Sequence, residues 1–489
     1  MDWRNLIPFA GGKSASKAPV RYRHFDMAKM GRLTNDWKVV SQSPDALIRP
    51  TLRTIRGRSR ELAVNNDYYK RFLRMVRRNV IGHQGIRLQV KPLQPDGKVD
   101  VGDKRTIETA WKKWCKKKYC SVDGRNSWLD IQQIAVETLA RDGECLIRKV
   151  KGFNNPFGFA LQLIEADMLD DQLNRKFSDG REISMGVEMD KWKKPVAYHI
   201  LTQHPGDDCY SFAGQKYQRI PADEIIHLYG QERPQQTRGI PWGHTAATRL
   251  HMNSGYEEAE LVAARVGASK MGFIQTESGD DYAGPEDEAG NMYMDAEPGI
   301  IEQLSEGQTF TSWDPAHPTS AFDQFEKRML MGAAAGLDIS YHKMANDLAG
   351  VNYSSGRLGE LDERDAWKMV QTYMVEHLCE DVFEDWLTFA IMSGALALPM
   401  SKFDKFNTPI FRPRGWMWVD PQKEATANVI AVKSGQKTLS DIAAEQGRDF
   451  EEVVQQMAMD IELAEQYGIT LNFDDLIITV EAKSDEKED

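Results

Sequence analysis

The stretch "RIPADEIIHLYGQERPQQTRGIPW", residues 219–242, marks the point at which the pattern of the chain changes. Before Pro241, short apolar runs rich in β-branched residues, such as "VAYHIL" and "EIIHLY", are typical of strands. After Pro241, apolar residues recur at helical spacing from about residue 245 to residue 271, a length on the order of 40 Å. The sequence therefore predicts an α+β block followed by long helices.

Upstream, the α+β block extends back to residue 44. Ser43 is a suitable N-cap and Pro44 suits the first helical position, so a helix is expected to begin there. A second amphipathic helix, "DIQQIAVETLARDG", ends at Gly143 and is followed by the strands "ECLIRKV" and "FALQLIEADML". Between these landmarks, Trp111 and Trp114 are interpreted as core anchors of a helix over residues 111–118. Residues 1–43, rich in Lys, Arg, Gly and Ser, are predicted to form a flexible arm.

Downstream, a second long helix is predicted over residues 319–341, about 35 Å long. Two helices of matched length would then form an antiparallel pair around a small tip. The tip, residues 271–314, holds eleven Asp and Glu and no Lys or Arg. A third long helix is expected over residues 357–393, ending near Gly394, and two shorter helices follow before an acidic tail.

The stretch "NDLAGVNYSSGRLGE", residues 346–360, interrupts this helical region with glycines, amides and hydroxyls. Glycine adopts backbone conformations that other residues avoid, so we predict a flexible loop with hinges at Gly350, Gly356 and Gly359. Lys343 and Arg357 are the cations nearest to this stretch. A nearly neutral, polar loop of this kind is suited to touching a charged partner without binding it tightly.

The sequence contains no recognisable catalytic or cofactor-binding motif. There is no H-E-x-x-H, G-x-S-x-G or G-x-G-x-x-G motif, and "GGKS" at residues 11–14 lacks the first glycine of a P-loop. The five cysteines form no C-x-x-C pair, which favours reduced thiols, and no apolar run is long enough to span a membrane. We therefore predict no catalytic residue, no metal and no cofactor. The acidic clusters at residues 280–288 could bind divalent cations, or serve a nuclease, but a solvated acidic loop is the commoner meaning of such clusters.

Charge is distributed unevenly along the chain. The whole chain carries −11, yet residues 1–80 contain 18 Lys and Arg against 6 Asp and Glu. The basic residues of this region lie among Tyr68, Tyr69 and Phe72, so they could contact nucleic acid. The alternative is a solvated helix face, or ion pairs with the acidic remainder of a neighbouring subunit. These basic residues are Arg53, Arg56, Arg58, Arg60, Lys70, Arg71, Arg74, Arg77 and Arg78.

Several segments together resemble one family, the lambda-type portal proteins of tailed bacteriophages. They are "RGRSRELAVNNDYYKRFLRMVRRNVIGHQGIRLQV", "IETAWKKWCKK", "IQQIAVETLARDGECLIRK", "ALQLIEADMLD", the opening stretch with its I-P-A-D-x-I-x-H and R-G-I-P elements, "ANDLAGVNYSSGRLGELDERDAW" and the C-terminal "WVDPQKEATA" region. The order and spacing of these segments over residues 50–455 carry the resemblance. The insertion between the two long helices matches least, because it is short and acidic.

The resemblance implies a portal fold assembled as a ring, usually of twelve subunits. Residues 44–241 would be the wing, 242–271 and 319–342 the two stem helices, 272–318 the clip and 343–357 the tunnel loop. Residues 358–395 would be the long kinked wing helix, and 396–489 the helical crown with its acidic tail. The residues expected to face DNA in the tunnel are Lys343, Asn346, Asn352, Tyr353, Ser354, Ser355 and Arg357, and those expected to contact a partner at the clip are Asp280, Asp281, Glu286, Asp287 and Glu288.

The resemblance also implies a function. The ring would sit at one capsid vertex, where double-stranded DNA is packaged and later ejected. It would dock the terminase large subunit, then head-completion or tail-adaptor proteins, and contact the major capsid and scaffold proteins. The expected location is the virion, with assembly in the host cytoplasm and no membrane contact. The alternatives are a DNA-binding module acting through the basic N-terminal region, or a different ring-forming head–tail connector.

Overall fold

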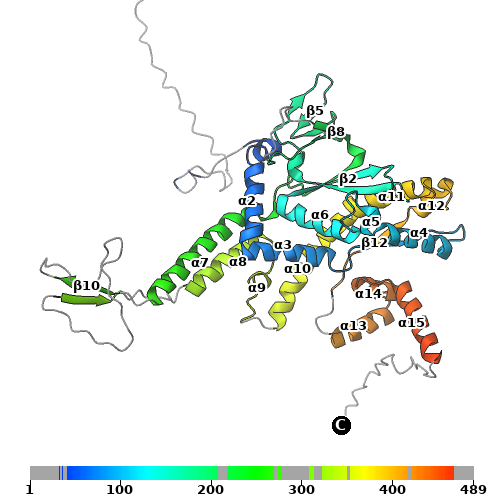
Figure 1. The fold of residues 1–489 in the computed structure, drawn as a ribbon. Helices are drawn as coiled ribbons and strands as arrows, with labels where there is room; N and C mark the ends of the chain where they lie inside the picture. The colour runs from blue at the N-terminus through cyan, green and yellow to red at the C-terminus, as the bar shows by residue number, and fades with distance from the viewer. Residues whose placement is uncertain are drawn as a thin grey trace, which may run out of the picture. The chain divides into compact units, whose positions relative to one another are not determined.

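The computed structural model describes residues 32, 36, 41–207, 217–268, 272–276, 308–312, 322–349, 353–416 and 421–466. The chain divides into two units, Met1–Ser43 and Pro44–Asp489. The arm predicted over residues 1–43 lies almost entirely outside the described residues, and the account below concerns the second unit (Figure 1).

Three helices open this unit, α1 (Pro44–Ile48), α2 (Leu52–Asn65) and α3 (Asp67–Val76). The start at Pro44 confirms the prediction. Asn66 separates α2 from α3, and its side-chain oxygen accepts a hydrogen bond of 2.8 Å from the Tyr69 amide, which caps α3. A π turn, η2 (Arg77–Ile81), ends α3 before strand β1 (Arg87–Val90).

Two antiparallel sheets form the β part. The first has the order β3-β2-β9, with β2 (Glu144–Lys151) between β3 (Phe159–Ile164) and β9 (Ile225–Tyr229). The second has the order β4-β5-β6-β7-β8, and its strands are β4 (Arg175–Lys176), β5 (Glu182–Ser184), β6 (Val187–Met189), β7 (Pro195–Leu201) and β8 (Tyr217–Pro221). The four strands predicted from sequence are confirmed as β2, β3, β7 and β9, and the α+β class is confirmed with them.

Helix α6 (Trp128–Asp142) leads directly into β2. Ser127 and Asp130 form a capping box at its start, and Gly143 ends it with a φ of 85°. This confirms the predicted helix end. Strand β1 pairs with β12 (Pro409–Arg412), a strand that the sequence pattern did not predict.

The main core lies between α4 (Val101–Trp114), α6 and α11 (Glu380–Met392). The Trp111 ring lies 4.8 Å from that of Trp114, 4.9 Å from that of Trp386 and 5.9 Å from that of Trp128, measured between centroids. All four tryptophans are buried, so the interpretation of Trp111 and Trp114 as core anchors is confirmed. The helix predicted over residues 111–118 is divided, because α4 ends at Trp114 and α5 (Lys117–Cys120) follows.

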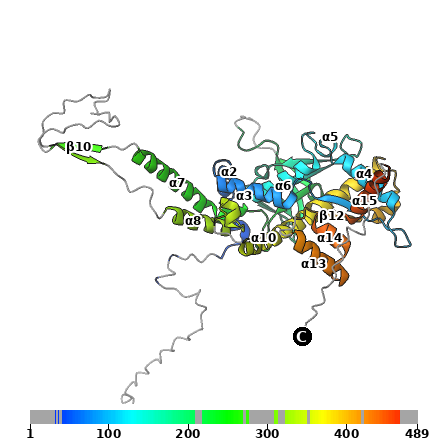
Figure 2. The same cartoon turned by 90° about the horizontal axis from the view of Figure 1, so that it is seen from below.

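Helices α7 (Ala247–Ala268) and α8 (Phe322–Gly336) form an antiparallel pair, here called the helical hairpin, and Figures 1 and 2 show them side by side. The hairpin follows a short 3-10 turn, η5 (Trp242–Thr245). Within the described residues α7 has 22 residues and α8 has 15, and the predicted end of the second helix at residue 341 is wrong, because α8 ends at Gly336. Helix α8 ends before residue 341 because the chain turns at Asp338, whose φ is 54°. Strand β10 (Gly272–Thr276) pairs with β11 (Gln308–Ser312), and the residues between these strands lie outside the described residues.

The remaining helices are α9 (Tyr341–Ala345), α10 (Tyr353–Met374), α11, α12 (Phe403–Phe406), α13 (Pro421–Lys433), α14 (Leu439–Glu445) and α15 (Phe450–Gln466). A π turn, η6 (Val375–Cys379), joins α10 to α11, and the end of α11 before Gly394 is as predicted. Three helices lie near the C-terminus where two were predicted, since α13 was missed. No helix in the described part of the chain has both the length and the apolar character needed to cross a membrane.

Candidate functional site at the base of the helical hairpin

The segment that leads from β9 into the hairpin crosses the end of α6 at very close range. A Cβ atom added to Gly239 would lie 1.9 Å from the carbonyl oxygen of Gly143, and one added to Gly143 would lie 2.2 Å from the Ile240 backbone. A Cβ atom at Gly243 would lie 2.3 Å from the ring of Tyr69. Only glycine fits at these three positions, and the close packing fixes the direction in which the hairpin leaves the sheet.

A buried carboxylate holds this crossing in place. Glu144, the first residue of β2, is fully buried, and so is the Arg238 side chain. Arg238 Nε donates to both carboxylate oxygens of Glu144 at 2.9 Å, and the Gly239 amide donates at 3.1 Å. Arg56 Nη2 lies 2.9 Å from Glu144 Oε1, and His227 Nε2 lies 3.1 Å from Glu144 Oε2. We call these side chains, Arg56, Glu144, His227 and Arg238, the buried anchor.

Arg238 also donates to three main-chain carbonyls. Its Nη atoms lie 2.9 Å from Leu169 O, 2.8 Å from Met185 O and 3.1 Å from Ala166 O. Arginine has five donors in a rigid planar arrangement, so one side chain can satisfy several acceptors at once. The anchor thereby links α2, both sheets and the segment that enters the hairpin. Two of its four residues, His227 and Arg238, belong to the stretch 219–242.

Charges within the anchor compensate one another. Burial opposes ionisation of Glu144, but the Arg238 and Arg56 guanidinium groups hold its pKa well below the usual range. Burial lowers the pKa of His227 despite the neighbouring Glu144, so His227 is neutral and donates its Nε2 proton. The anchor is therefore a stable ionic contact at neutral pH rather than a reactive group.

A neighbouring cluster resembles a metal site only in its spacing. Within the described part of the chain, the ligand atoms of Glu165, Asp167 and His204 lie within 4.8 Å of one another. Arg60 contacts both carboxylates, and Arg56 Nη1 lies 2.6 Å from Asp167 Oδ1. Two guanidinium groups already occupy these carboxylates, so the cluster is an ion-pair network.

The same network accounts for part of the basic N-terminal region. Arg53, Arg56 and Arg60 pair with carboxylates of their own chain, whereas the sequence alternative placed such partners in a neighbouring subunit. Tyr69 and Phe72 are buried in the main core. Among the described basic residues of this region, Arg58, Lys70, Arg74, Arg77 and Arg78 are exposed and could contact nucleic acid.

A second group of contacts joins the hairpin to α3. The Tyr68 hydroxyl donates to Glu326 at 3.2 Å, and the Asn253 amide donates to Glu257 at 2.6 Å. Burial, and then the neighbouring Glu326 carboxylate, raise the pKa of Glu257 to about 6. The two carboxyl groups lie on facing helices, so loss of a proton between them weakens the base of the hairpin.

Beyond the hairpin, the start of the predicted loop is held by contacts within the chain. Asn346 ends α9 with a φ of 57°, and its side-chain oxygen accepts from Arg71 Nη2 at 3.3 Å. Asp347 accepts from Lys327 Nζ at 2.9 Å and from the Tyr341 hydroxyl at 3.0 Å. The Lys327 ammonium is the main cause that lowers the pKa of Asp347 to about 2. Residues 346 and 347 are thus fixed to α3, α8 and α9.

Lys343 lies between carboxylates of α10. Its Nζ atom lies 3.5 Å from Glu363 and 4.0 Å from Glu360, and Glu363 is 5 % exposed. Of the two cations named for the loop, Lys343 is therefore compensated by carboxylates of its own chain.

The structure brings Lys343 and Asn346 together at the loop start but shortens the loop itself. Because α10 begins at Tyr353, Gly356 lies within a helix, and the prediction that the loop extends to residue 357 is wrong. Gly359 lies in α10, as expected from the helix predicted over residues 357–393. The role of both glycines as hinges stays a prediction. Gly350 and Asn352 lie outside the described residues, as do the side chains of Tyr353, Ser354, Ser355 and Arg357. The acidic residues Asp280, Asp281, Glu286, Asp287 and Glu288 also lie outside them.

Sequence reasoning missed Glu144, Arg238 and Asp347. Glu144 did carry a usable signal, because a single carboxylate at the start of an apolar strand is rarely buried without a partner. Asp347 carried none, since its partners Lys327 and Tyr341 are recognisable only after α8 and α9 are placed.

Comparison with known proteins gives the family. Residues 30–371 match the family described as "Phage portal protein, lambda family". The probable portal protein of Halomonas phage phiHAP-1 is 40 % identical over 463 residues, which cover 93 % of this chain and 89 % of that protein. Portal protein B of Escherichia phage lambda is 21 % identical over 471 residues, covering 87 % and 86 % respectively.

Among solved structures, the neck of an empty GTA particle computed with C6 symmetry matches with a TM-score of 0.47 and 11 % identity, covering 81 % of this chain and 93 % of that one. The sequence matches define the class: this is a phage portal protein, the component of the capsid vertex that serves DNA packaging. Within that class, the chain belongs to the lambda family of phage portal proteins.

Proposed function

We propose that this chain assembles as a ring of about twelve copies with closed cyclic symmetry. The central channel of the ring passes double-stranded DNA inward during packaging and outward during ejection. The observation that carries the proposal is the helical hairpin. Its described surface exposes Met252, Leu261, Val262 and Phe325, with exposed fractions of 65 %, 63 %, 52 % and 49 %. A two-helix hairpin cannot cover these side chains itself, whereas packing of hairpins side by side would.

The regions of the chain then take the roles that the family implies. Residues 44–241 and 358–395 form the wing, 242–271 and 319–342 the stem, 272–318 the clip, 343–357 the tunnel loop and 396–489 the crown with its acidic tail. The terminase large subunit docks first and head-completion or tail-adaptor proteins later, with Asp280, Asp281, Glu286, Asp287 and Glu288 contacting the partner at the clip. The major capsid and scaffold proteins contact the outside of the ring during assembly in the host cytoplasm. The protein itself acts without catalysis.

The electrostatics of the loop support passage rather than binding of DNA. Duplex DNA carries one negative charge about every 1.7 Å, and each uncompensated Lys or Arg that touches phosphate strengthens binding through counterion release. Lys343 is compensated by Glu360 and Glu363, which lowers its attraction for phosphate. Asn352, Ser354 and Ser355 offer hydrogen bonds to phosphate without a fixed charge.

Ring formation is tested by negative-stain microscopy of the purified chain with Leu261→Asp as the variant. We expect rings for the unaltered protein and dissociated subunits for the variant, because a buried carboxylate without a partner opposes association. Trp192→Asp is the control, since Trp192 is 79 % exposed on the turn between β6 and β7 and should leave the rings intact. Monomers of the unaltered protein under all conditions would contradict the proposal.

The loop is tested by DNA packaging in vitro. Gly350→Pro removes backbone freedom and Ser354→Lys adds a cation, so both variants should form rings but package poorly. Ser434→Lys, at an exposed serine between α13 and α14, adds the same charge elsewhere and should package normally. If Gly350→Pro and Ser354→Lys both package at the normal rate, residues 346–352 and the start of α10 are only a linker.

A further inference from the structure

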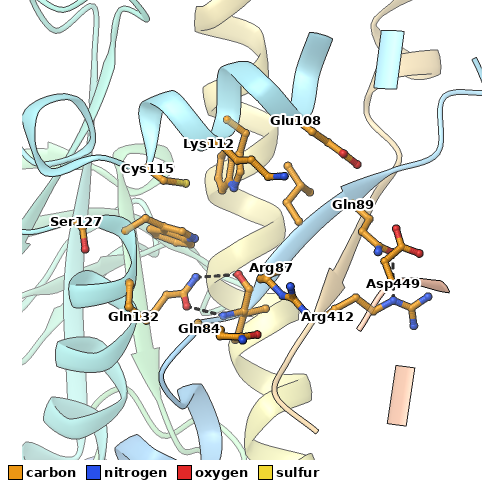
Figure 3. Close-up of a pocket in the computed structure, with 16 residues that line it drawn as sticks. Gln84, Arg87, Gln89, Glu108, Lys112, Cys115, Ser127, Gln132, Arg412 and Asp449 are labelled. Atoms are coloured by element: carbon orange, nitrogen blue, oxygen red, sulfur yellow. Dashed lines mark hydrogen bonds between the residues drawn. The ribbon is translucent and has the colours of Figure 1, made fainter. Parts of the chain in front are cut away.

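A pocket of about 250 Å³ lies between β1, α4, the start of α6 and β12 (Figure 3). Figure 3 shows Glu108 and Lys112 on α4, with Cys115 just past its end, along one side and Arg87 on β1 along the other. Small-molecule sites usually measure about 300–1,000 Å³, so this pocket is better matched to one or two side chains of a peptide.

The lining of the pocket is apolar at its base. Trp111 and Trp128 meet there at an interplanar angle of 76°, and Leu88 and Leu129 complete the surface. Both indole rings belong to the buried core, so the base is rigid. Such a surface favours aliphatic or aromatic side chains, because their burial removes apolar area from water.

The rim of the pocket is charged and carries more cations than acids. Its two acids are engaged within the chain: Glu108 accepts from the Val90 amide at 3.1 Å, and Asp449 accepts from the Glu451 amide at 3.1 Å. Arg412 donates to the Gln89 side chain at 3.3 Å, and its charge adds to the hydrogen bonds of Thr438 that lower the pKa of Asp441. With Arg87 and Lys112 it gives the lining three cations against two acids. An incoming segment should therefore carry an acid beside its apolar residues.

One segment of this chain has that composition. Residues 467–489, "YGITLNFDDLIITVEAKSDEKED", contain seven Asp and Glu against two Lys, and the apolar run 476–480 lies between Asp475 and Glu481. We propose that residues 473–481 of this C-terminal tail dock in the pocket, with apolar side chains on the tryptophan base and a carboxylate beside Arg412.

The tail is long enough to reach the pocket. Asp449 lines the pocket and immediately precedes α15, whose 17 residues extend about 25 Å. Residue 476 lies ten positions past the end of α15, and ten extended residues span up to about 33 Å. The tail can therefore turn back along its own helix, and docking would fasten α15 to α4 and β1.

Hydrogen exchange of the full-length subunit tests the proposal without DNA or partner proteins, so its outcome is separate from that of ring formation and packaging. Amides 473–481 should exchange at least about tenfold more slowly than in a synthetic peptide of residues 467–489. Arg412→Glu should return them to within about twofold of the peptide rate. Arg105→Glu, at an exposed arginine of α4 outside this pocket, makes the same charge change and should leave them protected.

A charge repair separates loss of docking from loss of folding. Asp474→Lys with Asp475→Lys, combined with Arg412→Glu, restores opposite charges and should restore slow exchange. The proposal is overturned if the tail of the unaltered protein exchanges as fast as the free peptide. It is equally overturned if Arg412→Glu leaves the protection unchanged.

Discussion

Replacing Arg238 by methionine should be among the most destabilising single substitutions in this chain. The variant keeps the aliphatic volume but removes every donor of the guanidinium group. Glu144 loses its closest cation but retains Arg56. Breaking this buried ion pair should therefore cost about 3 kcal/mol of unfolding free energy, the low end of the usual range, because one partner remains. The carbonyls of Ala166, Leu169 and Met185 also lose their donor, at about 1 kcal/mol each. The expected loss is roughly 4–6 kcal/mol, allowing for incomplete additivity.

Urea unfolding of dissociated subunits, followed by tryptophan fluorescence, measures this loss. Arg77→Met is the matched control, because Arg77 pairs with Glu137 at 3.0 Å on the surface and should cost less than about 1 kcal/mol. Arg238→Met combined with Glu144→Leu removes both charges, and it should be more stable than Arg238→Met alone. The reasoning is refuted if Arg238→Met costs no more than the control, or if the double variant is the less stable of the two.

Three further predictions concern the hairpin and the loop. Gly239→Ala should prevent folding in expression and solubility assays, whereas Gly255→Ala, on α7 with nothing within 4 Å of its Cβ position, should raise stability by about 0.5–1 kcal/mol. The pKa of Glu257 is raised to about 6 in the folded chain, so its stabilising contribution is full below the ordinary value near 4.5 and is lost as pH rises through 6. The Tm should therefore fall as pH rises over this range, and Glu326→Gln should make the Tm depend less on pH. Asp347→Asn should speed hydrogen exchange of residues 341–349 several-fold, because the Lys327 contact is lost, and unchanged exchange would contradict the role of Asp347.

Local sequence patterns predicted most of the α+β block because its strands and helices are bounded by strong signals. Ser127 and Gly143 delimit α6, and the apolar runs of β2, β7 and β9 stand between polar turns. Strand β12 was missed for a physical reason. It is four residues long and is stabilised by pairing with β1, more than 300 positions earlier in the chain, so nothing nearby signals it.

Helix α8 was predicted too long because apolar residues continue past its end. Leu337 and Ile339 keep the helical spacing, but their amides bond back to Ala333 and Ala334 in a tight turn. The chain turns at Asp338, whose φ is 54°, and Gly336 lies at the end of α8, where a Cβ atom would lie 3.0 Å from the Thr245 hydroxyl. Gly336 alone does not predict the end of α8, because its packing against Thr245 is visible only in the structure.

The candidate site was predicted less well than the fold. Composition predicted a loop over residues 343–357 because of its glycines, and the tunnel-facing role of Lys343 and Asn346 stays a prediction. Gly356 nevertheless lies in α10, as Gly359 does, since neighbouring residues and tertiary contacts outweigh a propensity cost of about 1 kcal/mol per glycine. Periodicity could not find the buried anchor, because it predicts which residues form β2 but not what contacts Glu144.

The burial of the anchor has a consequence for mechanics in concentrated electrolyte. A full phage head is crowded with counterions, and exposed ion pairs weaken there because the Debye length shrinks from about 10 Å at 0.1 M to about 3 Å at 1 M salt. Ions cannot enter between Arg238 and Glu144, since both side chains are fully buried. The ionic contact at the root of the hairpin should therefore persist at salt concentrations that weaken the exposed pair of Arg77 and Glu137.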